Sequence, residues 1–476
     1  MMSRPVMSRR IRVAVVGGGI SGLTAAFRLR QALGSDAQID VVESSDRLGG
    51  VLRTVDVGGR AVDVGAEAFI VRRPEALALI DELGLADDVV SPSGARPAIW
   101  SGAGLHPLPA PALMGIPASP EPVAGLVDSD DLDRLAGEAD RPLNWSVTQN
   151  PTVGDLVADR FGPSVVARSV DPMLGGVYSS LAADIGLREA IPALAARLDG
   201  GSPSLTAAVR SVIDSGAGAS GPVFGTLIGG YRRLLDALTA AAAVTPALAR
   251  AVVTLGSGAD GWTLGFGDGG SADYDGVVLA VPAPVAGELL TESAPAIGEA
   301  LVAVPRASSV VVSIALEPGT RLPDHSGVLV ATGETLRAKA FTFSSRKWPH
   351  LAGDDEPVSV RASFGRHGAP VPDEDDEPGV GERLVADALA DLDAVCAAAG
   401  VNAVSARVVD SYVQRWPGGL PVYGPGHLAA MARVDAHRPP RLALAGSAYA
   451  GVGVPACIGR AGRAAAAVVA DLTPET

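Results

Sequence analysis

The chain has few cysteines and few aromatic residues, and it lacks a long uninterrupted apolar segment. It contains two cysteines, Cys396 and Cys457, and aromatic side chains make up 4% of its 476 residues. Two cysteines provide neither a disulfide framework nor a cysteine-based metal site, so we expect a reducing compartment. The nearest approach to a membrane span, residues 238–255, is interrupted by Pro246 and Arg250, so we expect no transmembrane helix.

Basic residues are outnumbered by acidic ones. The chain has 38 Lys and Arg against 53 Asp and Glu, a formal net charge of -15. This balance disfavours nucleic acid and anionic membranes as partners, so we expect no nucleic acid and no integral membrane segment. The apolar run near the N-terminus is too short for a signal peptide, and we expect a cytoplasmic protein, at most loosely peripheral to the membrane. An anionic substrate would need a local cluster of cations.

Apolar residues make up 47% of the chain, which is typical of a globular protein with two or three interwoven domains. Apolar periodicity and glycine punctuation predict the elements. We expect a strand, glycine turn and helix at 11–33 and again at 441–472, strands at 39–43, 252–283, 307–316 and 357–366, and helices at 74–88, 152–170, 180–198, 231–242 and 381–400. We expect exposed loops at 117–143, 200–221 and 371–379.

The first glycine cluster lies between an apolar strand and an Ala-rich helix, in VAVVGGGISGLTAAFRLR (13–30). Gly17, Gly19 and Gly22 form GxGxxG, in which the glycines allow a tight turn, close approach of a pyrophosphate, and close helix–strand packing. Glu43 ends the next strand 21 residues after Gly22, where a carboxylate accepts hydrogen bonds from an adenosine ribose. The pattern predicts a dinucleotide site for FAD or NAD; the alternative is a glycine turn without a ligand.

Three further glycine motifs distinguish FAD from NAD. DRLGG (46–50) follows Glu43, VDVGAEAF (62–69) contains Gly65, and GVGVPACIG (451–459) places glycines before a predicted helix. The start of that helix could face the pyrimidine edge of a flavin and stabilise its negative charge. Each motif alone could be an ordinary turn, but together they favour FAD.

The chain resembles the protoporphyrinogen and coproporphyrinogen oxidase family, within the flavin amine oxidase superfamily, over nearly its whole length. The resemblance rests on the flavin motifs and on FGPSVVARSVDPMLGGVY (161–178), FGTLIGGYRRLLDAL (224–238), VVLAVPA (277–283), QRWPGGLPVYGPGHL (414–428) and SSRKWPH (344–350). The last of these is similar to a segment of Gram-positive-type coproporphyrinogen III oxidases. The resemblance implies a mixed α/β (α+β) fold: a Rossmann-like FAD-binding domain, an interleaved substrate-binding sheet domain and a helical domain.

The resemblance divides the chain into five segments. We expect the FAD-binding domain to comprise 1–90, 221–295 and 411–476, with a mainly helical, substrate-side excursion at 91–220 and the substrate-binding sheet domain at 296–410.

The resemblance also assigns cofactor contacts. It places the glycine loop at the pyrophosphate, Glu43 at the ribose, the backbone of Val252 at the adenine, and Trp416 near the flavin. The full set of expected FAD contacts is Gly17, Gly18, Gly19, Ile20, Ser21, Gly22, Glu43, Ser44, Gly49, Gly50, Val51, Gly65, Ala66, Glu67, Ala68, Val252, Trp416, Gly451, Val452, Gly453 and Val454. Val51 and Ala66 depart from the family pattern, where a basic residue and a proline are common.

The reaction implied by the resemblance is oxidation of coproporphyrinogen III to coproporphyrin III in haem biosynthesis. Hydride passes from a methylene bridge to flavin N5, and molecular oxygen accepts the electrons as hydrogen peroxide, in three two-electron steps. The sequence indicates no catalytic acid or base and no metal site. Alternatives are a protoporphyrinogen IX oxidase, an amine oxidase or carotene desaturase, or a flavin-binding regulatory protein without turnover. Partners beyond porphyrinogen and oxygen could include transient contact with the next haem-pathway enzyme.

Four propionates on the substrate would require cations in an otherwise acidic protein. The candidates are Arg72, Arg73, Arg346, Lys347, Arg361 and Arg366, and the aromatic candidates are Phe69, Tyr178, Trp348, Trp416 and Tyr449. Of these we select Arg72, Arg73, Tyr178, Arg346, Lys347 and Tyr449 as substrate contacts. The alternatives are solvated surface charges and core aromatics. We expect coproporphyrinogen III to be preferred over protoporphyrinogen IX.

Overall fold

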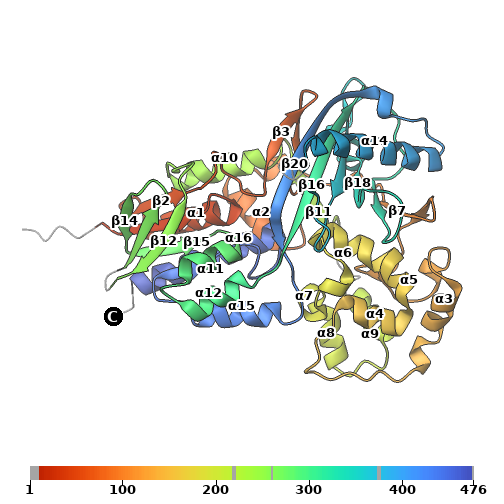
Figure 1. The fold of residues 1–476 in the computed structure, drawn as a ribbon, viewed down its shortest axis with the longest axis horizontal. Helices are drawn as coiled ribbons and strands as arrows, with labels where there is room; N and C mark the ends of the chain where they lie inside the picture. The colour runs from red at the N-terminus through yellow and green to blue at the C-terminus, as the bar shows by residue number, and fades with distance from the viewer. Residues whose placement is uncertain (1–9, 217–220, 259–260, 373–376, 474–476) are drawn as a thin grey trace, which may run out of the picture.

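The computed structural model describes residues 10–216, 221–258, 261–372 and 377–473. Two lobes lie along the long axis of the molecule, and the long strands β16 (Arg306–Leu316) and β20 (Val408–Pro421) run between them (Figure 1). One lobe contains both ends of the described chain. The other holds the second large sheet and a group of short helices.

A parallel sheet of four strands forms the centre of the first lobe. Its order is β2 (Gln38–Val42), β1 (Arg12–Val16), β15 (Gly276–Leu279) and β21 (Leu442–Leu444). Both faces of β1 are buried: Val13 and Val15 belong to one apolar cluster, and Ala14 and Val16 to another. A parallel strand covered on both sides has a continuous apolar sequence, as β1, β15 and β21 do, whereas the edge strand β2 contains Gln38 and Asp40.

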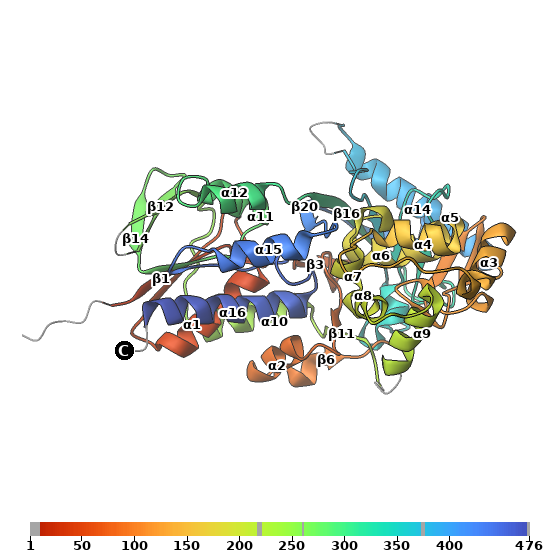
Figure 2. The same ribbon diagram turned by 90° about the horizontal axis from the view of Figure 1, so that it is seen from below.

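Helices and a small sheet cover the two faces of this parallel sheet. Helices α1 (Ile20–Leu33) and α16 (Val454–Leu472) lie side by side on one face, as Figure 2 shows. The other face packs against the antiparallel strands β12 (Val252–Ser257), β13 (Trp262–Phe266) and β14 (Ser271–Tyr274), and against α11 (Ala283–Leu290) and α12 (Pro295–Val302). The strand–glycine–helix units at 11–33 and 441–472 therefore place their helices in the same layer.

A seven-stranded sheet and a helical group form the second lobe. The sheet order is β20, β16, β19 (Val358–Phe364), β18 (Ala340–Thr342), β17 (Gly327–Val330), β7 (Ala98–Ser101) and β8 (Gly104–Pro107). One face packs against α14 (Val380–Ala398). The helical group contains α3 (Ser129–Ala136), α4 (Val153–Phe161), α5 (Pro163–Val165), α6 (Asp171–Tyr178), α7 (Leu187–Ala190), α8 (Pro192–Asp199) and α9 (Leu205–Gly216). Strands β7 and β8 fall within the excursion expected to be mainly helical.

The remaining elements are short connections and covering helices. They are β3 (Thr54–Val57), β4 (Arg60–Asp63), β5 (Phe69–Ile70), α2 (Pro74–Glu82), β6 (Val89–Val90), β9 (Ala112–Leu113), β10 (Ile116–Pro117), β11 (Phe224–Leu227), α10 (Tyr231–Ala242), α13 (Ser344–Lys347) and α15 (His427–Ala436). No helix within the described ranges combines the length and the apolar character needed to cross a bilayer.

Two of the expected loops are wrong. Residues 117–143 include α3 and the fully buried Glu138, whose carboxylate pairs with Arg160 at 2.7 Å. Residues 200–221 include α9, which buries Leu205 and Val209. Proline, aspartate and glycine at the flanks of these segments suggested loops. The short helices between them are stabilised by tertiary packing, which covers their apolar faces. Residues 217–220, and 373–376 of the third expected loop, lie outside the described residues.

Most of the other expected elements are confirmed. Helix α10 coincides with 231–242, α14 with most of 381–400, and strands β16 and β19 with 307–316 and 357–366. The expected helix at 74–88 ends early, at Glu82 in α2.

Candidate active site

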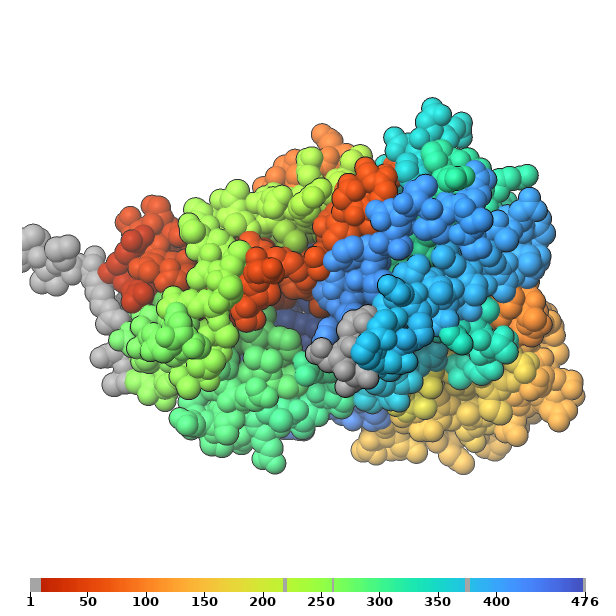
Figure 3. All heavy atoms as spheres, turned by 45° about the horizontal axis from the view of Figure 1, so that its top comes forward, coloured from red at the N-terminus to blue at the C-terminus, as the bar shows by residue number. Residues whose placement is uncertain are grey.

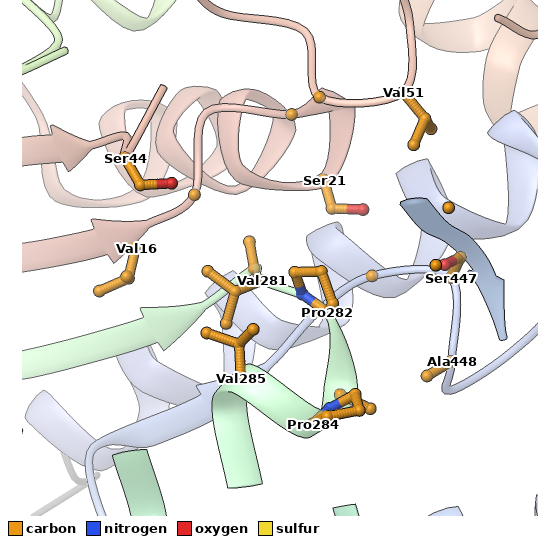
Figure 4. A pocket seen from close by; sticks show the side chains of 18 of the residues that line it. Val16, Ser21, Ser44, Val51, Val281, Pro282, Pro284, Val285, Ser447 and Ala448 are labelled. Atoms are coloured by element: carbon orange, nitrogen blue, oxygen red, sulfur yellow. The ribbon is translucent and has the colours of Figure 1, made fainter. Parts of the chain in front are cut away.

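A cavity of about 390 Å³ opens at the carboxyl end of β1. Figure 3 shows a hollow between the red N-terminal segment, the green segment that follows β15 and the blue C-terminal part of the chain. Figure 4 shows Ser21 and Ser44 along one side of the cavity, with Pro282 and Val285 across from them. This is the edge of an open parallel sheet where ligands commonly bind.

The three positions of GxGxxG are occupied by glycine for different structural reasons. A Cβ at Gly22 would lie 1.8 Å from the Gly17 carbonyl oxygen, and one at Gly17, whose φ is +105°, would lie 2.5 Å from the Ala280 carbonyl oxygen. These two glycines are required by packing. A Cβ at Gly19 would meet no protein atom nearer than 3.7 Å, and Gly19 lines the cavity. The space beside Gly19 is therefore available to a ligand.

Glu43 links the glycine loop to the turn after β2. Its Oε2 accepts the Gly18 N–H at 2.6 Å, and its Oε1 accepts the Ser45 N–H at 2.8 Å. The carboxylate thus lies at the cavity wall, where ribose hydroxyls could donate to it.

Two helix N-termini lie at this site without side-chain caps. The N-cap residues are Gly19 for α1 and Gly453 for α16, and neither first turn contains an acidic residue. Uncapped N–H groups and the helix dipole favour an anionic ligand. Cys457 of α16 also lines the cavity, and burial raises the pKa of its thiol to about 11, so it stays neutral.

Trp416 forms part of the opposite wall and is fixed by the loop before β5. Its indole Nε1–H donates to the Val64 carbonyl at 2.9 Å. A Cβ at Gly65 would lie 1.9 Å from the Val51 carbonyl oxygen and 3.2 Å from Trp416 Cζ2, so Gly65 is needed for this close packing.

Glu67, in the same loop, is the centre of a buried ion cluster. Its side chain is 10% exposed; Lys347 Nζ lies 2.9 Å from one carboxylate oxygen and Arg361 Nη1 3.6 Å from the other. Arg361 also donates to the Gly65 carbonyl at 2.6 Å, and Ser344 donates to the Glu67 carboxylate. Burial alone would raise the pKa of Glu67, but Lys347 and Arg361 lower it to about 2. The cluster holds the loop between the cavity and the seven-stranded sheet.

Tyr423 and His427 hold the C-terminal glycine turn. The Tyr423 hydroxyl donates to the Ser447 carbonyl at 2.5 Å and accepts the Gly451 N–H at 2.8 Å. His427 Nε2 lies 2.6 Å from the Ala448 carbonyl oxygen, and its ring centroid lies 4.3 Å from that of Tyr423. Burial lowers the pKa of His427, which therefore stays neutral and donates from Nε2.

About half of the expected cofactor contacts line this cavity. These are Gly17, Gly19, Ile20, Ser21, Glu43, Ser44, Gly49, Gly50, Val51, Val252 and Trp416. The others lie in the glycine loop or in the two turns just described, not in the lining: Gly18, Gly22, Gly65, Ala66, Glu67, Ala68, Gly451, Val452, Gly453 and Val454.

The structure does not gather the expected substrate contacts into one group. Arg73 pairs with Glu75 at 2.9 Å, Arg346 with Asp324, and Lys347 with Glu67. Arg72 donates to the Gly221 carbonyl at 3.3 Å. Tyr449 is 8% exposed within the core that covers the parallel sheet, and Tyr178 lies on α6 with its ring centroid 6.2 Å from that of Tyr423. Phe69 and Trp348 are core residues.

Several lining residues were not expected from the sequence. They are Arg250, Ala251, Val281, Pro282, Ala283, Pro284, Val285, Arg306, Pro417, Gly418, Gly419, Gly446, Ser447 and Ala448. Some of them lie within quoted motifs such as VVLAVPA and QRWPGGLPVYGPGHL, but only the fold shows that they face one cavity.

Comparison with known proteins identifies the family. The model of the flavin containing amine oxidoreductases matches residues 20–469. This chain belongs to that family. Within it, the chain is 50% identical over 461 residues to the coproporphyrinogen III oxidase of Mycobacterium tuberculosis (96% of this chain, 97% of the relative). It is 32% identical to the coproporphyrinogen III oxidase of Propionibacterium freudenreichii (96% and 90%).

A solved structure agrees with the fold. The chain superimposes on a protein from Exiguobacterium sp. 255-15, provisionally named a protoporphyrinogen oxidase, with a TM-score of 0.83 and 26% identity over 97% of this chain and 99% of that one. The family confirms the expected fold and FAD as the cofactor. The residues present fit FAD: an uncapped helix start, the space at Gly19 and the Glu43 carboxylate lie along one cavity.

Proposed function

We propose that this protein oxidises coproporphyrinogen III to coproporphyrin III, with molecular oxygen as the electron acceptor. The observation that carries the proposal is the 50% identity, over nearly the whole of both chains, to an enzyme with that name. The cavity at the edge of the parallel sheet supports a bound cofactor. One of its walls includes Trp416 of β20, which supports binding of the substrate on the side of the seven-stranded sheet.

FAD, when bound, supplies the acceptor for a hydride from a methylene bridge of the porphyrinogen. The chain's own residues bind and orient. Gly19 leaves room for the pyrophosphate, and the start of α1 presents N–H groups to it. Glu43 accepts hydrogen bonds from the ribose. Trp416, held by Val64, and the turn held by Tyr423 form the walls toward the flavin end.

The overall reaction balances as three two-electron oxidations. Coproporphyrinogen loses six hydrogen atoms, and three molecules of oxygen become three of hydrogen peroxide. We assign no catalytic acid or base. The net charge of -15 disfavours docking on an anionic membrane, and a cytoplasmic location stays a prediction, as does transient contact with the enzyme that uses the product.

The deciding experiment compares two substrates on the purified, FAD-loaded protein. We expect porphyrin fluorescence to appear with coproporphyrinogen III at a higher kcat/KM than with protoporphyrinogen IX, with peroxide formed in a three-to-one ratio to porphyrin. A preference for protoporphyrinogen IX would favour the protoporphyrinogen oxidase alternative. A flavin-loaded protein that oxidises neither substrate would contradict the proposal.

A further inference from the structure

Cations near the cavity and in the second lobe differ in whether a carboxylate pairs with them. Some are paired: Arg73 with Glu75, and Lys347 and Arg361 with Glu67. A paired cation is largely neutralised and has little net attraction left for a ligand carboxylate.

Others form no such pair, and three of these, Arg306, Lys339 and Arg366, are here called the cationic rim. None of the three forms an ion pair with a carboxylate of the described residues. Arg306 begins β16 and lines the cavity beside Gly418. Lys339 precedes β18, and its Nζ donates to Ser179 Oγ at 2.7 Å and to the Gly365 carbonyl at 2.6 Å, both uncharged acceptors.

A single turn after β19, which carries Arg366, connects the backbone at Arg306 with the side chain of Lys339. The turn contains Gly365, Arg366 and His367; the His367 N–H donates to the Ser179 carbonyl at 2.8 Å, and its Nδ1 lies 3.4 Å from the Arg306 carbonyl oxygen. The turn therefore contacts the backbone of Arg306 on one side and the ammonium of Lys339 on the other.

The cationic rim lies where α6 meets the cavity wall. Ser179 follows Tyr178 at the end of α6, and the Tyr178 ring lies beside Tyr423, which holds the turn at Ser447 and Gly451. Arg306 lines the cavity beside Gly418, two residues after Trp416, and Lys339 reaches Ser179 at the end of α6.

Lys339 lacks the counter-charge that a half-buried ammonium needs. Burial, together with Arg366, lowers the pKa of Lys339 to about 7. The groups that face its Nζ are the hydroxyl of Ser179, which follows α6, and, from the turn after β19, the Gly365 carbonyl and Arg366. An ammonium has three donors, two of which are used here, so one remains for a ligand oxygen. A ligand carboxylate would supply both the acceptor and the charge.

We propose that Arg306, Lys339 and Arg366 bind propionates of the substrate and select the tetracarboxylate over the dicarboxylate. This inference rests on the proposed function and adds the residues that determine specificity. Coproporphyrinogen III has two propionates where protoporphyrinogen IX has vinyl groups, so unpaired cations at this position discriminate between them.

The test compares Lys339→Met, Arg366→Gln and the double variant with wild type. Arg346→Gln is the matched control, because Arg346 is a cation of the same lobe whose guanidinium is paired with Asp324. Equilibrium binding of coproporphyrin III and of protoporphyrin IX is measured by fluorescence, and kcat/KM is measured for both porphyrinogens. We expect the double variant to bind coproporphyrin III about tenfold more weakly or worse and protoporphyrin IX within about threefold of wild type.

A pH series adds a readout that general destabilisation would not reproduce. Raising the pH from about 6 to about 8 should weaken coproporphyrin III binding to wild type, because Lys339 loses its proton while the propionates stay ionised. This pH dependence should be reduced in Lys339→Met and retained in Arg346→Gln.

Equal losses for the two porphyrins, or an effect no larger than that of Arg346→Gln, would overturn the inference. If Lys339→Met does not fold with normal FAD content, Arg366→Gln, on a turn, decides the question with an expected loss of about threefold for coproporphyrin III alone. A wild-type protein that oxidises neither porphyrinogen overturns the proposed function instead, which separates the two failures.

Discussion

The cofactor side of the cavity depends on backbone groups, whereas the cationic rim depends on side chains. On the cofactor side, Gly17, Gly19 and Gly22 lie within six consecutive residues, and backbone groups and empty space are the functional features. At the cationic rim, Arg306, Lys339 and Arg366 come from separate strands or turns, and side-chain charge is the functional feature.

This difference has a physical origin. A helix start and the missing Cβ atoms of glycine are local properties, so a short motif is enough to create a pyrophosphate site. A net positive region in a chain with a charge of -15 depends on which cations meet carboxylates and which do not. That pairing depends on tertiary structure. Substitutions on each side of the cavity separate the two contributions.

Gly19→Val should abolish FAD binding while leaving a folded protein. A Cβ here meets no protein atom within 3.7 Å, but a branched side chain would fill the space of the pyrophosphate. Flavin absorbance after purification and far-UV circular dichroism are the measurements. Gly125→Val, at an open position outside the cavity, is the control. Full flavin content in Gly19→Val would show that the cofactor does not lie along this loop.

Glu67→Gln should lower the free energy of unfolding by about 3–5 kcal/mol, because it leaves Lys347 and Arg361 without their buried counter-charge. Urea unfolding at neutral pH measures the loss. Glu75→Gln, which removes a more exposed pair with Arg73, should cost less than about 1 kcal/mol.

The same carboxylate predicts a pH dependence. The folded protein holds the pKa of Glu67 at about 2, below its ordinary value, so its stabilisation is present above about pH 4.5 and is lost as the pH falls toward 2. Glu67→Gln should lack this part of the acid sensitivity. An unchanged acid profile in the variant would contradict the ion cluster.

Tyr423→Phe should lower stability by about 1–2 kcal/mol and weaken FAD binding several-fold, since the hydroxyl bridges Ser447 and Gly451. Tyr178→Phe provides a control in a neighbouring ring. If both variants retain FAD equally well, the C-terminal turn does not depend on this hydroxyl.

Replacing Arg72 and Arg73 together by Gln should have the smallest effect. Arg73 is paired with Glu75 and Arg72 donates to a backbone carbonyl, so we expect the KM for coproporphyrinogen III to rise about threefold at most. This rise should still exceed the rise in the KM for protoporphyrinogen IX. Steady-state kinetics with both substrates provide the comparison with the cationic rim. A larger effect here than in the Lys339 and Arg366 double variant would reverse our assignment of specificity.

The structure gathers many of the expected cofactor contacts around one cavity but does not gather the expected substrate contacts. Eleven of the expected cofactor contacts line the cavity, among them Gly19, Glu43, Val252 and Trp416. Of the cations selected as substrate contacts, Lys347 is in a buried ion cluster and Arg346 is on the surface with Asp324. Lys339 lies outside every motif of the sequence, so no local pattern marks it as a ligand contact.

The two strand–glycine–helix units and the preference for FAD follow from the sequence alone, because they depend on apolar periodicity and on glycine spacing within short segments. The family follows from the resemblance of several longer motifs. Only the tertiary structure decided that α9 is a core helix, that Gly65 packs against Val51 and Trp416, and that Glu67 neutralises Lys347. It also decided which cations remain unpaired. Burial and ion pairing depend on contacts between residues that are far apart in the chain, and a one-dimensional pattern contains no record of those contacts.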